Sequence, residues 1–189
     1  IGSSSLLETL GDIGDNDLVK GAVIHLDSPG GSAIASEVLW QAVQKVGRKK
    51  PVFVSVGALA ASGGYYIACA ANEIYVAPHS IIGSIGVGGG KVTLGSLYEK
   101  IGVSVHRRSR GALGDMFNSV NTFTPNERAM LQTVLQRIYE QFTERVVLGR
   151  GNRVSDIDAI AQGRLFTGRQ AVKNGMADHM GNLENALVA

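Results

Sequence analysis

The stretch that decides the expected fold is residues 18–31, which read Leu18-Val19-Lys20-Gly21-Ala22-Val23-Ile24-His25-Leu26-Asp27-Ser28-Pro29-Gly30-Gly31. The first part is a short apolar run, and the last part is a cluster of turn-forming residues. This order predicts a buried strand over 18–26 that ends in a loop. From Ser32 to Val46 apolar side chains recur at helical spacing until Gly47, which predicts a helix after the loop.

The same order of elements is expected again farther along the chain. Residues 51–56 predict a second strand, which leads to the glycine cluster Ala60-Ala61-Ser62-Gly63-Gly64. The apolar run over 65–71 predicts a second helix, and 74–77 a third strand. Alternating strands and helices predict an α/β fold with a largely parallel sheet, in which loops at the carboxyl ends of the strands gather any chemistry.

Two threonines mark the expected starts of later helices. Thr124 is followed by Pro125 and Glu127, a combination typical of a capped helix start, and one face of the helix that follows carries apolar residues up to Gly149. Thr167 begins a similar pattern, with Gln170 in the capping position. Residues 107–122 are expected to form an extended surface segment.

Length and composition limit the kinds of protein that the chain can be. Its 189 residues suit one domain over 1–189, and 44% hydrophobic with 18% charged residues indicates a folded chain. A formal charge of +2 gives no reason to expect a nucleic-acid partner. Cys69 is the only cysteine, which excludes an internal disulfide, and no metal or cofactor is predicted. The abrupt start at Ile1 suggests a piece of a longer protein.

Ser62 is the candidate nucleophile. A serine between a strand and an apolar helix lies where free backbone N–H groups favour developing negative charge. Gly63 can donate one N–H group to an oxyanion, and Gly31, on the neighbouring glycine loop, can donate the second. The alternative is that these small residues only allow a helix to pack closely on the sheet.

A nucleophile also needs a base, and the sequence leaves its identity open. The four histidines are His25, His79, His106 and His179, and each has a structural interpretation as well. A lysine with a lowered pKa can serve instead. Lys91, directly after Gly88-Gly89-Gly90, is the candidate in this chain.

Several motifs together resemble the signal peptide peptidase A (protease IV) family of the ClpP/crotonase superfamily. They are Asp27-Ser28-Pro29-Gly30-Gly31, Ala60-Ala61-Ser62-Gly63-Gly64-Tyr65-Tyr66-Ile67-Ala68, Gly83-Ser84-Ile85-Gly86-Val87, and the segment Gly163-Arg164-Leu165-Phe166-Thr167-Gly168-Arg169-Gln170-Ala171. The resemblance implies a ClpP/crotonase-like α/β fold of repeated ββα/βαβ units, with helices flanking a mainly parallel sheet. It also implies that Ser62 is the nucleophile and that Gly31 and Gly63 form the oxyanion hole.

The implied function is that of a serine endopeptidase of Ser-Lys type. Members of this family degrade hydrophobic peptides, such as signal peptides left in the membrane after cleavage, and the resemblance implies a homo-oligomer or ring. It further implies a bacterial or plastid-type peptidase that is associated with the inner membrane through segments absent here and faces the periplasm.

One departure from the family pattern concerns the base. Short-form members carry a lysine in a Ser-Gly-x-x-Lys-like segment, and the matching stretch here, Arg110-Gly111-Ala112-Leu113-Gly114-Asp115, has Gly114 in its place. The favoured explanation is that the chain resembles the nucleophile-bearing C-terminal half of a long-form member, whose lysine comes from another half or subunit. The alternatives are Lys91 or a histidine as base, or loss of activity. Two rival functions also stay open: an acyl-CoA-binding crotonase-fold subunit and a non-catalytic subunit.

Overall fold

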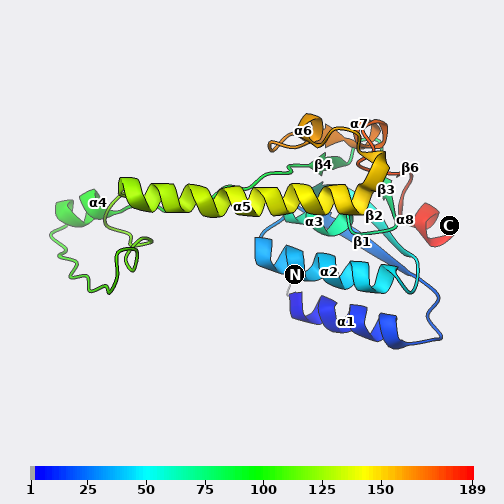
Figure 1. Cartoon of the computed structure of the whole chain (residues 1–189), viewed down its shortest axis with the longest axis horizontal. Coiled ribbons are helices and arrows are strands. Elements are labelled where there is room, and N and C mark those ends of the chain that lie inside the picture. The colour runs from blue at the N-terminus through cyan, green and yellow to red at the C-terminus, as the bar shows by residue number, and fades with distance from the viewer. Residues whose placement is uncertain (1–2) are drawn as a thin grey trace. The chain divides into compact units, whose positions relative to one another are not determined.

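The predicted alternation of strands and helices is present in the computed structural model, which describes residues 3–189 (Figure 1). The first part of the chain forms α1 Ser3–Asp15, β1 Ala22–Ser28, α2 Ala33–Gly47, β2 Val52–Ala61, α3 Gly63–Ala68, β3 Glu73–Val76 and β4 Ile81–Gly83. The rest forms α4 Gly95–Lys100, α5 Pro125–Arg150, a 3₁₀ turn at Gly151–Arg153, α6 Ile157–Ile160, β5 Leu165–Thr167, α7 Gly168–Lys173, β6 His179–Met180 and α8 Leu183–Leu187.

The chain divides into two compact units. The first joins the residues up to Gly86 to Tyr139–Ala189, and the second is Val87–Ile138. Helix α5 runs from the second unit into the first. The expectation of one domain over 1–189 stays a prediction, because two compact units can belong to a single domain.

The sheet lies in the first unit and is mainly parallel, as predicted. Its strands follow the order β5-β4-β2-β3-β6, and β1 pairs with β2. Only the β4–β5 pair is antiparallel among the strand pairs of residues 3–189. Strand β2 is central because it pairs with β1, β3 and β4. Its neighbouring residues Val54, Ser55 and Val56 are all buried, which suits a strand with both faces covered because successive side chains point to opposite faces.

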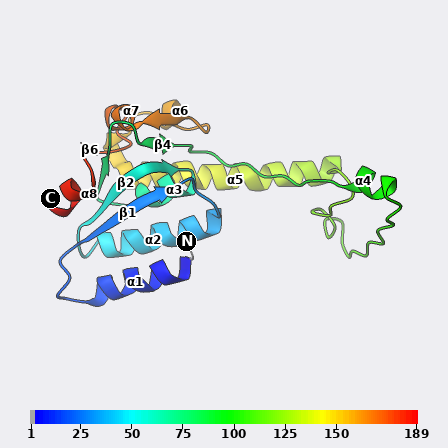
Figure 2. The same cartoon turned by 180° about the vertical axis from the view of Figure 1, so that it is seen from behind.

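Helices cover this sheet in layers. Helix α3 contacts both α2 and the strands β1 and β2, and α1 packs against α2 (Figures 1 and 2). On α2 the residues Leu39, Trp40, Val43 and Val46 are buried. Ile34 and Val38, which belong to the predicted helical spacing, are exposed, so the predicted apolar face is buried only in part. The predicted mixed α/β architecture, with helices flanking a mainly parallel sheet, is therefore confirmed.

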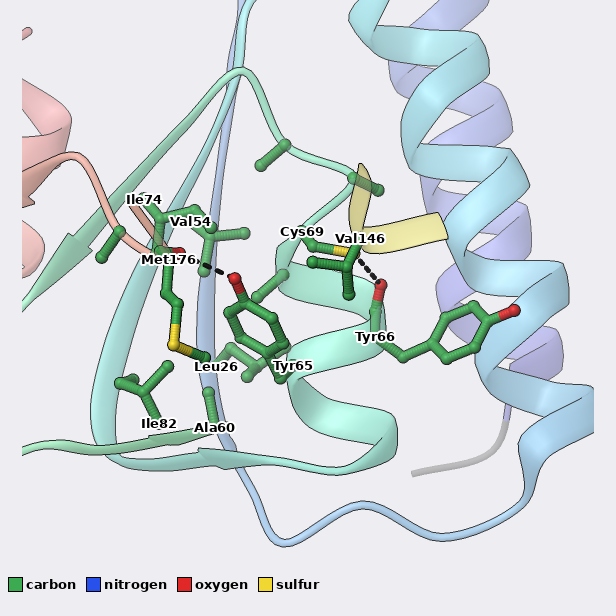
Figure 3. Close-up of a cluster of buried hydrophobic side chains, with 14 of the residues drawn as sticks. Leu26, Val54, Ala60, Tyr65, Tyr66, Cys69, Ile74, Ile82, Val146 and Met176 are labelled. Atoms are coloured by element: carbon green, nitrogen blue, oxygen red, sulfur yellow. Dashed lines mark hydrogen bonds between the residues drawn. The ribbon is translucent and has the colours of Figure 1, made fainter. Parts of the chain in front are cut away.

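The centre of the core surrounds Tyr65 on α3 (Figure 3). Its ring is fully buried, and its hydroxyl donates to the carbonyl oxygen of Met176 at 3.0 Å. Burial raises the pKa of Tyr65 well above its ordinary value, so the hydroxyl stays neutral and acts as a donor. Cys69 lies beside it and is buried, and burial raises the pKa of this thiol to about 12. This thiol is therefore a packing group without nucleophilic character.

Both predicted helix starts have reciprocal caps. The Thr124 hydroxyl accepts from the Glu127 N–H, and the Glu127 carboxylate accepts from the Thr124 N–H. Thr167 and Gln170 form the same arrangement at α7. The apolar face predicted for the long helix is buried only in part, because Phe142 is buried whereas Met130 is exposed.

Candidate active site

Ser62 occupies the turn between β2 and α3. Its backbone has φ 50° and ψ −122°, a conformation that residues with a side chain rarely adopt. The turn is fixed on both sides, because the Ser62 N–H donates to the Gly83 carbonyl oxygen at 2.8 Å and the Ser62 carbonyl accepts from Tyr66 N–H at 2.9 Å. The side chain is partly exposed. Strained backbone of this kind, held by its surroundings, is common at functional sites.

The glycine loop after β1 touches the Ser62 turn. A Cβ atom on Gly30 would lie 2.7 Å from the nitrogen of Gly63 and 2.8 Å from the Cβ of Ser62. A Cβ atom on Gly63 would lie 3.2 Å from the nitrogen of Gly31. The two nitrogens predicted to form an oxyanion hole are thus neighbours, beside Ser62. Neither loop can hold this arrangement with a side chain at Gly30 or Gly63.

Two further features keep the loops in place. Gly30 has φ 107°, a left-handed value suited to glycine, and its N–H donates to the Ser28 hydroxyl at 3.1 Å. A Cβ atom on Gly63 would also lie 2.5 Å from Oγ of buried Ser36, so α2 packs directly against the turn. Residues that lie 32 or 33 positions apart in the sequence are therefore in direct backbone contact.

Comparison with known proteins assigns the chain to a family. The family model described as Peptidase family S49 matches residues 44–189, which include the Ser62 turn. The chain belongs to peptidase family S49. Its mixed α/β architecture is consistent with the ClpP/crotonase-like fold of this family.

Several relatives of this S49 chain are peptidases by name. The chloroplastic serine protease SPPA of Arabidopsis thaliana is 36% identical over 186 residues, which cover 98% of this chain and 28% of the relative. Protease 4 of Haemophilus influenzae is 35% identical over 98% of this chain and 30% of its own length. A protein of Enterococcus faecium with the provisional name signal peptide peptidase SppA is 32% identical over 97% of this chain and 54% of its own length. The chain therefore spans about a third to a half of the relatives named here.

Three histidines of the S49 chain do not lie at the Ser62 end of the sheet. His25 pairs with Ser55 of β2. Tyr75 of β3 pairs with both Ser55 and His179, so His179 lies in the same row of the sheet as His25. His79 precedes β4, at the opposite end of that strand from Gly83. His179 is moreover bound to Glu73, with 2.9 Å between Nε2 and Oε2. The register therefore gives no support to a histidine base from the first unit.

The remaining candidates for the base lie in the second unit. Lys91 Nζ donates to the Met116 carbonyl oxygen at 2.7 Å and lies 4.4 Å from the ring centre of Phe123. Gly114 lies in a turn where a Cβ atom would come within 2.5 Å of the Arg110 carbonyl oxygen. A side chain at Gly114 would therefore require the turn to move. His106 is exposed in the same unit.

An ion-pair network in the first unit includes Tyr66 of α3, the helix that follows Ser62. Glu37 on α2 accepts hydrogen bonds from Arg145 on α5 and from the Tyr66 hydroxyl on α3, at 2.8 Å and 2.6 Å. Burial would raise the pKa of Glu37, but the hydrogen bonds from Arg145 and Tyr66 hold it at about 2. Burial, together with the bond to Glu37, also raises the pKa of Tyr66. The carboxylate therefore joins three helices around the start of α3.

The sequence did not single out Ser84. It follows β4, which pairs with the end of β2 through Ala61 and Gly83, and it has φ 52°. Its N–H donates to the Arg164 carbonyl oxygen at 2.7 Å. Ser84 belongs to the motif Gly83-Ser84-Ile85-Gly86-Val87, but nothing in this motif predicts a positive φ angle at the serine.

Two negative findings apply to residues 3–189. No three histidine, cysteine, aspartate or glutamate side chains gather there in a group that could hold a metal ion. None of the helices described there is both long enough and apolar enough to cross a membrane.

Proposed function

We propose that this chain carries the nucleophile and the oxyanion hole of a serine peptidase of Ser-Lys type. The observation that carries the proposal is the contact between the Gly30-Gly31 loop and the Ser62-Gly63 turn. This contact gives Ser62 two neighbouring backbone donors, Gly31 N–H and Gly63 N–H. In residues 3–189 neither N–H group donates a hydrogen bond, which leaves both available to an oxyanion.

The reaction follows from this geometry. Ser62 Oγ attacks the carbonyl carbon of the scissile peptide bond, and a base takes the hydroxyl proton. The carbonyl oxygen becomes an oxyanion that accepts from the N–H groups of Gly31 and Gly63. Collapse of this intermediate expels the amine, which takes up the proton, and leaves an acyl-enzyme on Ser62. Water then attacks the ester and restores the serine.

The base in this proposal is a lysine from another half or subunit of a homo-oligomer or ring. The support is that Gly114 stands where short-form members carry the lysine, and that Lys91 already has partners in Met116 and Phe123. The relatives named serine protease SPPA and protease 4 are much longer than this chain, so they have room for such a half. Lys91 remains the alternative within the chain.

The proposed substrates are hydrophobic peptides, such as cleaved signal peptides, at the extracytoplasmic side of the inner membrane. The provisional name of the Enterococcus faecium relative supports this substrate class. Contact with the membrane would come from segments outside this chain.

A serine-directed fluorophosphonate tests the proposal on the full-length protein. We expect one covalent adduct, on Ser62, seen by intact mass and peptide mapping, and no adduct after Ser62→Ala. Peptidase assays should then show faster cleavage of an apolar signal-peptide sequence than of a polar peptide of equal length. Binding of acyl-CoA thioesters without any adduct would favour the acyl-CoA alternative and refute the proposal.

A further inference from the structure

Strand β2 contains an irregularity close to the site. Leu26 pairs with Val56 and Ser28 pairs with Ala60, so the chain advances farther on β2 than on β1 between the two pairs. The extra residues on β2 form a bulge, Gly57-Ala58-Leu59, opposite Asp27. Bulges of this kind bend a strand and redirect the side chains that follow.

The bulge lies where β2 changes its neighbour. Residues 53–56 of β2 pair with β3, whereas 59–61 pair with β4. Ser62 follows directly after the second segment. The bulge therefore sets the direction in which the nucleophile leaves the sheet.

The side chain of Asp27 holds one side of this bulge. Its Oδ1 accepts from the Leu59 N–H at 3.0 Å. A Cβ atom on Gly57 would lie 3.2 Å from Oδ2 of Asp27, so a glycine there makes room for the carboxylate. On the other side the buried Ser80 hydroxyl donates to the Gly57 carbonyl oxygen at 2.6 Å.

The residue after Asp27 acts on the other loop. Ser28 Oγ accepts from the Gly30 N–H, which orders the loop that carries Gly31. Two adjacent residues at the end of β1 thus contact the two parts of the candidate site. Asp27 binds the end of β2 that leads to Ser62, and Ser28 binds the glycine loop that carries Gly31. Small displacements between such parts are costly, since about 1 Å of misplacement can reduce a rate on the order of a hundredfold.

We propose that Asp27 is a positioning residue for Ser62, acting as a hydrogen-bond acceptor that fixes the β2 bulge. This inference rests on the proposed function for its catalytic consequence. The carboxylate is at the surface, so its role requires an acceptor oxygen at the right place and does not require a negative charge. That requirement distinguishes Asp27 from a general base or an electrostatic group.

Two substitutions separate acceptor from charge in the full-length protein. Asp27→Asn keeps an acceptor oxygen and removes the charge, whereas Asp27→Glu keeps the charge and moves the oxygen by one methylene into the space next to Gly57. We expect near wild-type turnover for Asp27→Asn, and for Asp27→Glu and Asp27→Ala a kcat lower by roughly ten- to a hundredfold with little change in KM. Asp17→Ala, which removes another surface carboxylate, is the matched control and should have no effect.

Hydrogen exchange of the Leu59 amide provides a readout independent of activity. It should accelerate in Asp27→Ala and Asp27→Glu and stay slow in Asp27→Asn. Unchanged Leu59 exchange in Asp27→Ala, or a loss of turnover in Asp27→Asn as large as in Asp27→Ala, would overturn the inference. If the wild-type protein forms no adduct on Ser62, the proposed function fails, and the Leu59 exchange still decides whether Asp27 holds the bulge.

Discussion

The two compact units differ in what they do with their apolar side chains. The first unit buries residues such as Val54, Ile74 and Ile82 completely around the sheet. In the second unit, residues 87–138, only Met116 and Glu127 are buried. Large apolar side chains exposed in that unit are Val92, Leu94, Leu97, Ile101, Val103, Val105, Phe117, Met130 and Val134. The candidate nucleophile therefore lies on a unit with its own core, and the candidate base positions lie on a unit with almost none.

This difference has a consequence for how each part of the site can be tested. Around Ser62, packing is dense and small changes should be felt. Around Lys91, few side chains are buried, so substitutions there should have small effects unless the residue takes part in the chemistry. A side chain at Gly114 would instead displace its own turn.

The largest effect is expected from removal of the Ser62 hydroxyl. Ser62→Ala should lower peptidase turnover by on the order of 10⁵–10⁶, because no other nucleophile replaces the serine. The thermal unfolding temperature should hardly change, since the side chain is partly exposed. Turnover is measured with an apolar fluorogenic peptide. Ser155→Ala, at an exposed serine of the same unit, is the control, and appreciable turnover in Ser62→Ala would refute the assignment.

A methyl group on Gly63 should have the next largest effect. Gly63→Ala places a Cβ atom 2.5 Å from Ser36 Oγ and 3.2 Å from the Gly31 nitrogen. We expect a roughly hundred- to thousandfold loss of rate, comparable to loss of one oxyanion donor, and a destabilisation of about 1–3 kcal/mol by overpacking.

The matched control for Gly63→Ala comes from the second unit. Gly90 has no atom within 4 Å of its Cβ position, so Gly90→Ala should leave stability and rate unchanged. The double variant Ser36→Ala/Gly63→Ala should regain part of the stability, because it removes the closest contact. Equal losses in Gly63→Ala and Gly90→Ala would contradict the contrast between the units.

The free energy of unfolding at acidic pH should depend on Glu37. Its pKa falls from 4.5 to about 2 on folding, so the carboxylate stabilises the fold above pH 4.5, and this contribution is lost as the pH falls towards 2. The expected contribution is on the order of 2–3 kcal/mol. Urea unfolding between pH 2 and 7 should show it.

Glu37→Gln should unfold more easily at pH 7 and have a flatter profile between pH 4.5 and pH 2 than the wild type. Glu8→Gln, at an exposed position on α1, should keep the wild-type profile. A wild-type profile in Glu37→Gln would show that the network with Arg145 and Tyr66 carries no such energy.

The smallest effect is expected at Lys91. Lys91→Met removes the bond to the Met116 carbonyl and the contact with the Phe123 ring, which should cost about 1 kcal/mol. Fluorophosphonate labelling of Ser62 in the full-length protein should persist, because the proposed base lies in another half or subunit. Lys100→Met is the control. Complete loss of labelling in Lys91→Met alone would instead identify Lys91 as the base.

The fold near the site could be predicted because local signals agree there. The turn residues after Leu26, the helical spacing after Ser32 and the capping pairs at Thr124 and Thr167 each depend on neighbouring residues only. The structure has β1, α2, α5 and α7 at these places, but β1 spans Ala22–Ser28, so Asp27 and Ser28 belong to the strand and not to the predicted loop. The expectation that Gly31 and Gly63 lie beside Ser62 used a simple rule as well, since adjacent parallel strands end at the same edge.

Features that depend on register could not be predicted. Strand β2 extends to Ala61, well beyond the predicted end at Val56, because the bulge with Gly57 interrupts the apolar pattern. The strands β4, β5 and β6 are only two or three residues long, too short for a periodic signal. Asp27 belongs to the motif Asp27-Ser28-Pro29-Gly30-Gly31, but its bond to Leu59 depends on how β1 and β2 are aligned.

The β2 bulge also constrains how this chain can vary in length. Val56 and Ala60 pair with Leu26 and Ser28, which face the same side of β1, so the extra residues leave the inside and outside of β2 unchanged. Deletion of one residue from the bulge would move every later side chain of the strand to the opposite face of the sheet. Loss of two would keep the sides but draw Ser62 back by roughly 7 Å. Length changes in this segment should therefore be absent among active homologues, even where the sequence drifts.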